Sequence, residues 1–194
     1  MKSLYFLFFL FPITLLAQWN QLGTNLNGDN TEDLFGKSVS LNNDGTRIAV
    51  GAYYNDTNGS DAGQVTVFEF INNSWSQIGQ NIYGQNTDDR AGTEVALNDD
   101  GTILAVGIMG YNNITGRVLI YKEENGVWNT LGNPIEGVSN SFFGQQLKFN
   151  RDGTRIIIAG SSASGNGNTN NGLVQVYSFD GTDWFQLGQD IWGG

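Results

Sequence analysis

The sequence predicts an all-β fold in which a unit of four antiparallel strands is repeated along the chain. Three observations predict it. A segment that begins with tryptophan recurs, Asp-Gly pairs lie between short apolar runs, and no segment after the first seventeen residues keeps a helical hydrophobic period. The composition agrees, because 27 glycines against 2 prolines and an aromatic content of 12% indicate packed, regular structure rather than disorder.

The tryptophan segment sets the period. The four copies are WNQLGTNLNG from Trp19, WSQIGQNIYG from Trp75, WNTLGNPIEG from Trp128 and WFQLGQDIWG from Trp184. The tryptophans are 56, 53 and 56 residues apart, and glycines follow each one by four and by nine positions. Counted from tryptophan, the repeats occupy about 19–74, 75–127 and 128–183, with the start of a fourth at 184–194. We expect each tryptophan to pack its outer strand on a neighbouring unit, with a local partner for the ring N–H.

Two further blocks recur between the tryptophans. One has an Asp-Gly pair between apolar runs, which is typical of a hairpin, and its copies are FGKSVSLNNDGTRIAVG from Phe35, AGTEVALNDDGTILAVG from Ala91 and FGQQLKFNRDGTRIIIAG from Phe143. The other alternates like a strand, in GQVTVFEF from Gly63, GRVLIYKE from Gly116 and GLVQVYSF from Gly172. With the tryptophan strand, each period has the four strands of a β-propeller blade.

The blade count leaves the ring incomplete. Residues 18–194 provide about three complete blades, preceded by a leading outer strand at Trp19–Gly28. Because propellers typically close with about four to eight blades, we expect the remaining blades to come from sequence beyond Gly194 or from oligomerisation.

The first seventeen residues, MKSLYFLFFLFPITLLA, read as a secretory signal peptide. Lys2 precedes an apolar run from Leu4 to Leu16 that is short for a membrane-spanning helix, and the small residue Ala17 marks a cleavage site. The alternative is an uncleaved N-terminal anchor. We expect a secreted or cell-surface protein of bacterial type, without a membrane span once the signal is removed. The absence of cysteine agrees with bacterial export, since no disulfide is used.

The string DLFGKSVSLNNDGTRIAVGAY, from Asp33 to Tyr53, resembles the FG-GAP repeat of integrin-like ectodomains and bacterial exported proteins. Phe35-Gly36 and Gly51-Ala52 occupy the two namesake positions, whereas Ala91-Gly92 replaces the first pair in the second repeat. The stretch NDDGTILAV is also similar to WD-type repeats. The resemblance implies a propeller, seven-bladed in that family, and calcium held by a loop rich in Asp and Asn between the first two strands.

The calcium loop of that family is too short here, because Asn42, Asn43 and Asp44 run directly into a tight turn. A weaker calcium candidate lies in the loop that follows, where Asp56, Asn58 and Ser60 stand at alternate positions and Asp61 comes next. Such clusters are common turn material, so we predict a polar surface loop and expect no metal and no cofactor.

The sequence argues against catalysis within this chain. Histidine and cysteine are absent, which excludes Ser-His-Asp and Cys-His nucleophiles. The acidic pairs Glu32-Asp33 and Asp88-Asp89 could resemble the acids of a glycosidase, but they recur with the period, so we interpret them as caps of the turn that enters the first strand. No catalytic residue is therefore assigned, and we expect the chain not to be an enzyme.

The remaining function is recognition. We expect a surface-displayed recognition, adhesion or scaffold module that binds an extracellular protein or a glycan through its loops, with Tyr53, Tyr54 and Tyr111 as a possible ligand surface. The net charge of −10 excludes the basic stripe that nucleic acid requires. The alternative is a part of a larger extracellular propeller enzyme, a hydrolase or lyase, whose catalytic residues lie outside this chain.

Overall fold

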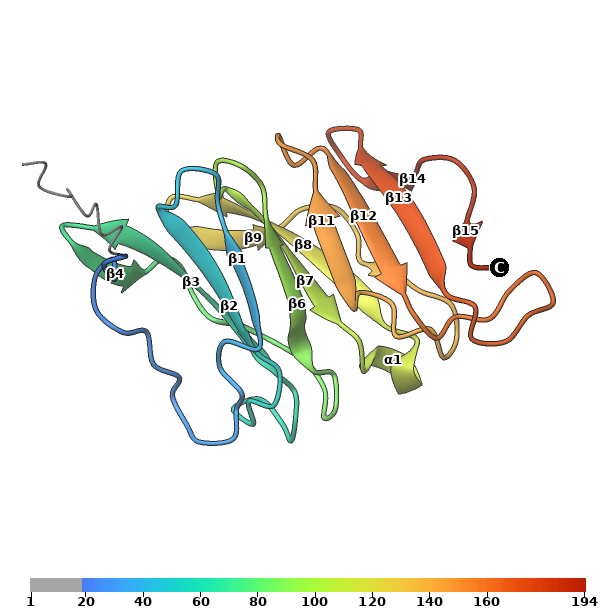
Figure 1. The fold of residues 1–194 in the computed structure, drawn as a ribbon, viewed down its shortest axis with the longest axis horizontal. Helices are drawn as coiled ribbons and strands as arrows, with labels where there is room; N and C mark the ends of the chain where they lie inside the picture. Colours follow the sequence, from blue (N-terminus) through green and yellow to red (C-terminus); the bar gives the residue numbers. More distant parts are fainter. Residues whose placement is uncertain (1–18) are drawn as a thin grey trace, which may run out of the picture.

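The computed structural model describes residues 19–194, so the signal peptide predicted for residues 1–17 lies outside the described part. Three antiparallel sheets stand side by side along the longest axis of the molecule (Figure 1). The predicted all-β fold of about three four-stranded blades without a closed ring is confirmed. Among residues 19–194, no helix is long and apolar enough to cross a lipid bilayer.

Each blade has four main strands and a short fifth one. Blade 1 consists of β1 (Ser38–Leu41), β2 (Arg47–Ala52), β3 (Gln64–Ile71), β4 (Ser74–Gln77) and β5 (Ile82–Tyr83). Blade 2 consists of β6 (Ala91–Leu97), β7 (Ile103–Ile108), β8 (Arg117–Glu124), β9 (Val127–Thr130) and β10 (Ile135–Glu136). Blade 3 consists of β11 (Gln146–Phe149), β12 (Arg155–Gly160), β13 (Leu173–Phe179), β14 (Trp184–Gln186) and β15 (Ile191–Trp192). Each folded blade thus begins with the strand of the Phe-Gly block, so a repeat counted from tryptophan starts in the middle of one blade and ends in the middle of the next.

The Asp-Gly pairs form the predicted hairpin turns. In blade 1 the carboxylate Oδ1 of Asp44 accepts hydrogen bonds from the backbone N–H of Thr46 at 3.0 Å and from its hydroxyl at 2.6 Å. Gly45 has a φ of +76°, a conformation that glycine adopts without steric cost. The same two bonds recur in blades 2 and 3, which fixes the register of the first two strands.

The outer strand is broken where the sequence places the first recurrent glycine. In blade 1, β4 and β5 both pair with β3, and Gly79 lies in the gap between them. A Cβ on Gly79 would lie 2.6 Å from the indole of Trp128 in the next blade, so only glycine leaves room for that ring. The indole Nε1 of Trp128 donates to the backbone oxygen of Ile78 at 3.1 Å.

The tryptophan contact recurs between successive units. Trp184 donates to the backbone oxygen of Leu131 at 2.9 Å, and Trp75 donates to that of Leu22 at 3.0 Å. Trp75, Trp128 and Trp184 therefore each pack on the preceding segment or blade, as predicted. Their hydrogen-bond partners are not local, however, but lie about one period earlier in the chain, so that part of the expectation is wrong.

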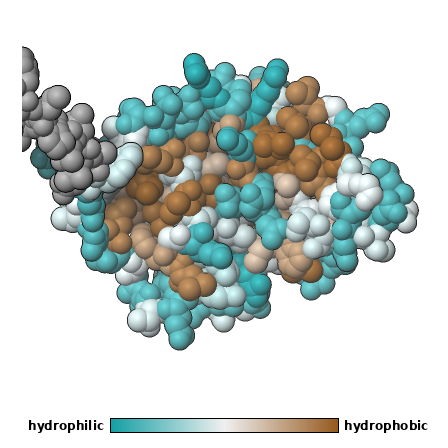
Figure 2. All heavy atoms as spheres, viewed as in Figure 1, coloured by the Kyte–Doolittle hydropathy of each residue, from teal (hydrophilic) through white to brown (hydrophobic). Residues whose placement is uncertain are grey.

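The blades are also joined through their inner strands. Ala49 and Val50 of β2 are buried, as expected for a strand pressed between neighbours. The first apolar cluster joins blades 1 and 2, and the second joins blades 2 and 3. Figure 2 shows hydrophobic residues in a band across this face of the molecule, with hydrophilic residues mostly along the upper and lower edges.

The leading segment differs from its prediction. Residues 19–28 were expected to form an outer strand, but residues 19–37 contain no strand. A strand requires a neighbour for its backbone groups, and this segment pairs with no strand among the described residues. It is held instead through Leu22 and Gly23, which lie against Trp75, while Trp19 is 98% exposed.

Candidate functional site

The loops and the Asp-Gly turns lie on opposite edges of the blades. The three Asp-Gly turns lie along the upper edge in Figure 1, and α1 (Tyr111–Ile114) and the β2–β3 loop lie along the lower edge. The lower edge carries a cavity of about 780 Å³ between the link from blade 1 to blade 2 and the β7–β8 loop. Ten residues line it: Asn86, Thr87, Asp88, Asp89, Arg90, Gly110, Tyr111, Asn112, Asn113 and Ile114.

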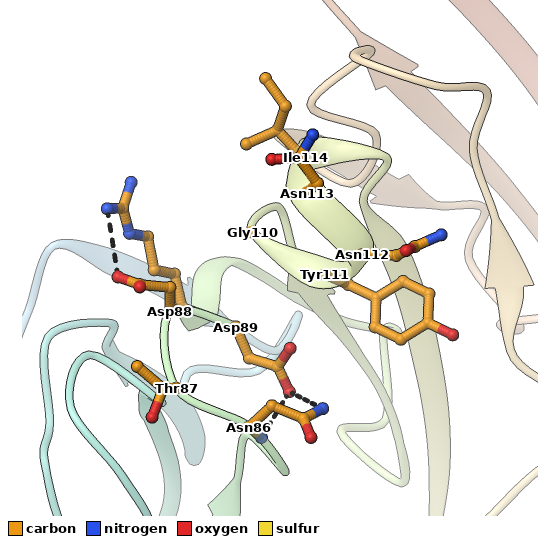
Figure 3. Close-up of a pocket in the computed structure, with 10 residues that line it drawn as sticks. Asn86, Thr87, Asp88, Asp89, Gly110, Tyr111, Asn112, Asn113 and Ile114 are labelled. Carbon is orange, nitrogen blue, oxygen red and sulfur yellow. Dashed lines mark hydrogen bonds and ion pairs between the residues drawn. The ribbon is translucent and has the colours of Figure 1, made fainter.

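One wall of the cavity is the link between blades 1 and 2, and hydrogen bonds within the protein hold this link in place. The carboxylate Oδ2 of Asp89 accepts the backbone N–H groups of Gln85 and Asn86, each at 2.9 Å, and Asp89 is buried (Figure 3). At the equivalent position of blade 1, the Asp33 carboxylate accepts the Asn55 side-chain amide at 2.7 Å. The bonds of Asp89 cap the turn that enters the first strand, as predicted, whereas the Asp33 bond connects that turn to the β2–β3 loop.

The other wall is α1, a single turn whose backbone is unusual. Asn112 and Asn113 have φ/ψ of 46°/59° and 54°/58°, and Ile114 has a φ of 59°. Left-handed conformations are free of strain for glycine and tolerated by asparagine, whereas a β-branched residue such as isoleucine adopts them least readily. Three in succession make a left-handed turn that presents the Asn112 and Asn113 side chains to solvent.

Some residues with positive φ recur at the same place in every blade, so their conformation belongs to the repeated scaffold. Asp88 and Arg90 also have positive φ, at 62° and 57°. The aligned residues of the other blades share it, with 73° and 55° at Glu32 and Leu34, and 58° and 52° at Asn140 and Phe142. In the α1 turn, Ile114 also has counterparts, because Asp61 and Asn170 likewise stand two residues before the recurrent glycine and each have a φ of 51°. Only the left-handed pair Asn112 and Asn113 is particular to this loop. The difference from the other blades is therefore confined to these two asparagines.

Two arginines connect the cavity to the tyrosines selected from the sequence. Arg90 lies over the ring of Tyr54, with its guanidinium carbon 5.8 Å from the ring centroid, and its Nη2 is 3.6 Å from the carboxylate of Asp88. Arg117 of β8 lies over Tyr111 at 4.0 Å. Both contacts are within the range of cation–π attraction. The Nε of each arginine is buried and has no hydrogen-bond partner among the described residues.

The three predicted tyrosines thus belong to one region, although only Tyr111 lines the cavity. The rings of Tyr53 and Tyr54 pack at a tilt of 52° with their centroids 4.2 Å apart, and Arg90 links Tyr54 to the cavity wall. Burial, followed by a hydrogen bond with Tyr54, raises the pKa of Tyr53 above its ordinary value of 10.0. The phenol therefore keeps its proton at neutral pH.

In the weak calcium candidate, two of the four side chains are bonded to the protein itself. The Asp56 carboxylate accepts the backbone N–H of Asp61 at 2.8 Å, and the Asn58 amide donates to the backbone oxygen of Gly84 at 2.6 Å. The backbone oxygen of Ser60 accepts the N–H of Asp88, which ties this loop to the cavity wall. Within residues 19–194, no three His, Cys, Asp or Glu side chains form a group that could hold a metal ion.

Sequence reasoning missed the two arginines and the two asparagines of α1. A signal was nevertheless present, because Arg90 stands where the other repeats have Leu34 and Phe142, and Arg117 stands where they have Gln64 and Leu173. Both departures fall in the same repeat. A residue that breaks the period is thus a better indicator of this site than a residue that follows it.

The comparisons with known proteins agree with the repeat and the fold. The FG-GAP repeat family matches residues 27–68. A putative 6-phosphogluconolactonase from Bacteroides uniformis is 17% identical, with a TM-score of 0.53, over 80% of this chain and 40% of that chain. A second one, from Bacteroides fragilis, is 16% identical, with a TM-score of 0.55, over 80% of this chain and 38% of that chain. This chain therefore spans about two fifths of their length, and at these identities the likeness concerns the fold alone.

The β-propeller domain of the Trilobed protease from Pyrococcus furiosus is 10% identical, with a TM-score of 0.49, over 81% of this chain and 42% of that chain. No curated protein sequence matches the chain. The recurring blades and the match at residues 27–68 lead to the same identification: the chain is an FG-GAP-like β-propeller, of which residues 19–194 describe three blades.

Proposed function

We propose that this chain is a recognition module of an exported or surface-displayed propeller, and that it binds an extracellular protein or a glycan at its loop edge. The observation that carries the proposal is the cavity between blades 1 and 2, where the left-handed pair Asn112 and Asn113, which has no counterpart in the other blades, faces the inter-blade link. Binding surfaces are commonly built from variable loops on a rigid scaffold. The apolar, charged leader at residues 1–17 supports export.

We propose binding rather than catalysis because the acids of the cavity have other partners. Asp89 is buried and capped by backbone N–H groups, and Asp88 faces the guanidinium of Arg90. A general acid and base pair would need two carboxyl groups that are free to reach a substrate.

The proposal is tested with one substitution made on each edge of the blades. Arg90→Asn removes the guanidinium that links the cavity to Tyr54, and asparagine tolerates the positive φ of this position. Arg151→Asn is the matched control, because Arg151 lies beside an Asp-Gly turn on the opposite edge and its side chain is 89% exposed. Purified chain with each substitution is compared with the wild type for binding to immobilised fibronectin, fibrinogen and collagen and to a glycan array.

We expect the wild type to bind at least one of these ligands, Arg90→Asn to weaken that binding at least tenfold, and Arg151→Asn to leave it unchanged. Equal losses in both variants, or binding that neither variant alters, would place recognition outside the loop edge. The absence of any binding by the wild type would refute the recognition function itself. Detection of the mature chain outside an expressing bacterial cell, lost when residues 2–17 are deleted, tests export separately.

A further inference from the structure

The cavity between blades 1 and 2 has a chemical character that narrows its ligand. Among the described residues, the side chains of Thr87, Asn112 and Asn113 make no hydrogen bond with the protein. All three are exposed, Thr87 on the inter-blade link and the two asparagines on the α1 turn that faces it (Figure 3). A carboxamide offers both donors and an acceptor, and a hydroxyl offers both as well. The unused groups of the cavity therefore suit a ligand that can donate and accept at several neighbouring points.

The charges of the cavity disfavour an ion as ligand. Asp88 and Asp89 oppose an anion, and the net charge of −10 adds to this repulsion at longer range. The Arg90 guanidinium opposes a cation, and its Nη2 lies 3.6 Å from the Asp88 carboxylate, which balances much of its charge. A neutral ligand encounters neither repulsion.

The shape and lining favour a small ligand over a protein surface. The volume of about 780 Å³ lies within the range of roughly 300–1,000 Å³ that is usual for small-molecule pockets. Protein interfaces are centred on desolvated aromatic or apolar anchors, whereas this lining is mostly amide, hydroxyl, carboxylate and guanidinium groups. Only Tyr111 and Ile114 contribute large apolar surface to it.

We infer that the cavity binds a neutral oligosaccharide, whose hydroxyl groups bond to Thr87, Asn112 and Asn113. This inference rests on the proposed function and assigns a ligand class to its site. The left-handed turn at Asn112–Ile114 then has a purpose, because it holds two adjacent carboxamides at the cavity wall. Arg117, which lies on Tyr111, fixes that ring at the base of the same turn.

The test replaces the two carboxamides without straining the backbone. Asn112→Gly/Asn113→Gly removes both side chains, and glycine adopts positive φ freely. The matched control is Asn166→Gly/Asn170→Gly, which removes two asparagines with φ of 53° and 51° from the β12–β13 loop of blade 3. The ligands for calorimetric titration are the hexasaccharides of β-1,4-glucose, α-1,4-glucose, β-1,4-xylose, β-1,4-mannose and N-acetylglucosamine, with oligogalacturonate as anion and chitosan hexamer as cation.

We expect at least one neutral hexasaccharide to bind with a submillimolar Kd, the α1 variant to weaken that binding at least tenfold, and the blade 3 variant to retain it. Binding of only the anionic or the cationic oligomer overturns the inference, as does equal weakening by both variants. If no saccharide binds while an immobilised protein binds in an Arg90-dependent manner, the inference fails and the proposed recognition function stands. If neither class binds, both fail.

Discussion

Replacement of Trp128 by phenylalanine measures how strongly one blade is tied to the preceding one. Trp128 is 2% exposed, and its indole N–H donates to the Ile78 backbone oxygen at 3.1 Å. Phenylalanine keeps an aromatic ring but leaves that carbonyl without its donor, and a hydrogen bond of this kind contributes about 1 kcal/mol net. The smaller ring also leaves space beside Gly79, where the indole now packs, so we expect a total loss of about 2 kcal/mol in the free energy of unfolding.

The other tryptophans provide a graded control. Trp75 makes the same bond to Leu22 at 3.0 Å but is only half-buried, so Trp75→Phe should cost about 1 kcal/mol. Trp19 is 98% exposed, and Trp19→Phe should change stability by less than about 0.5 kcal/mol. Urea titration followed by far-ultraviolet circular dichroism is the appropriate assay, because tryptophan fluorescence changes with each variant. A loss for Trp128→Phe no larger than that for Trp19→Phe would refute the role of the indole in joining the blades.

Three further predictions concern a glycine that packs against a tryptophan ring, a buried aspartate and an Asp-Gly turn. Gly132→Ala should destabilise the chain more than Gly188→Ala in the same urea assay. A Cβ added at Gly132 would lie 2.8 Å from the Trp184 indole, whereas a Cβ added at Gly188 would have no atom within 4 Å. Equal losses would show that only the positive φ shared by the two glycines matters. Asp89→Asn should cost about 2 kcal/mol, since a buried charged acceptor of two backbone N–H groups is lost, and an unchanged urea midpoint would contradict this. Hydrogen bonds from the side chain and backbone of Thr46 lower the pKa of Asp44 below its ordinary value of 3.8, so their contribution to stability is present above that pH and is lost as the pH falls below it. Thr46→Val should therefore flatten the acid limb of a plot of stability against pH, and an unaltered limb would show that the turn does not contribute.

The sequence was sufficient for the repeating part of the fold because its signals are local. An Asp-Gly pair between two apolar runs specifies a hairpin within a dozen residues, and the carboxylate of Asp44 bonds to its own turn. The break in the outer strand could not be derived in this way. Gly79 was visible as a periodic glycine, but its role depends on the ring of Trp128, which lies almost one period later in the chain.

The leading segment failed as a strand prediction for a related reason. Residues 19–28 have the same pattern as the outer strands, yet a strand forms only when another strand supplies its hydrogen bonds, and the pattern itself does not report whether that partner is present. The candidate site was only partly predictable. Tyr111 was found as a departure from the period, and Arg90 could have been found in the same way, whereas the left-handed turn at Asn112 and Asn113 became visible only in the structure.

Trp128 and Trp184 each join their blade to the preceding one, and these tryptophan joints also bear on how such a chain can change its length. The donor of each joint lies in one blade and the acceptor in the blade before it, so that blade 2 both gives an indole, from Trp128, and receives one, at Leu131. Every unit therefore has the same two complementary edges. Duplication or deletion of one whole period joins an edge to an equivalent edge and preserves every remaining joint. Loops within a blade can also change in length without loss of a joint, since the tryptophans are 53 to 56 residues apart. The array can accordingly grow or shrink by recombination in whole units, and its ligand-binding loops can diverge independently of the joints.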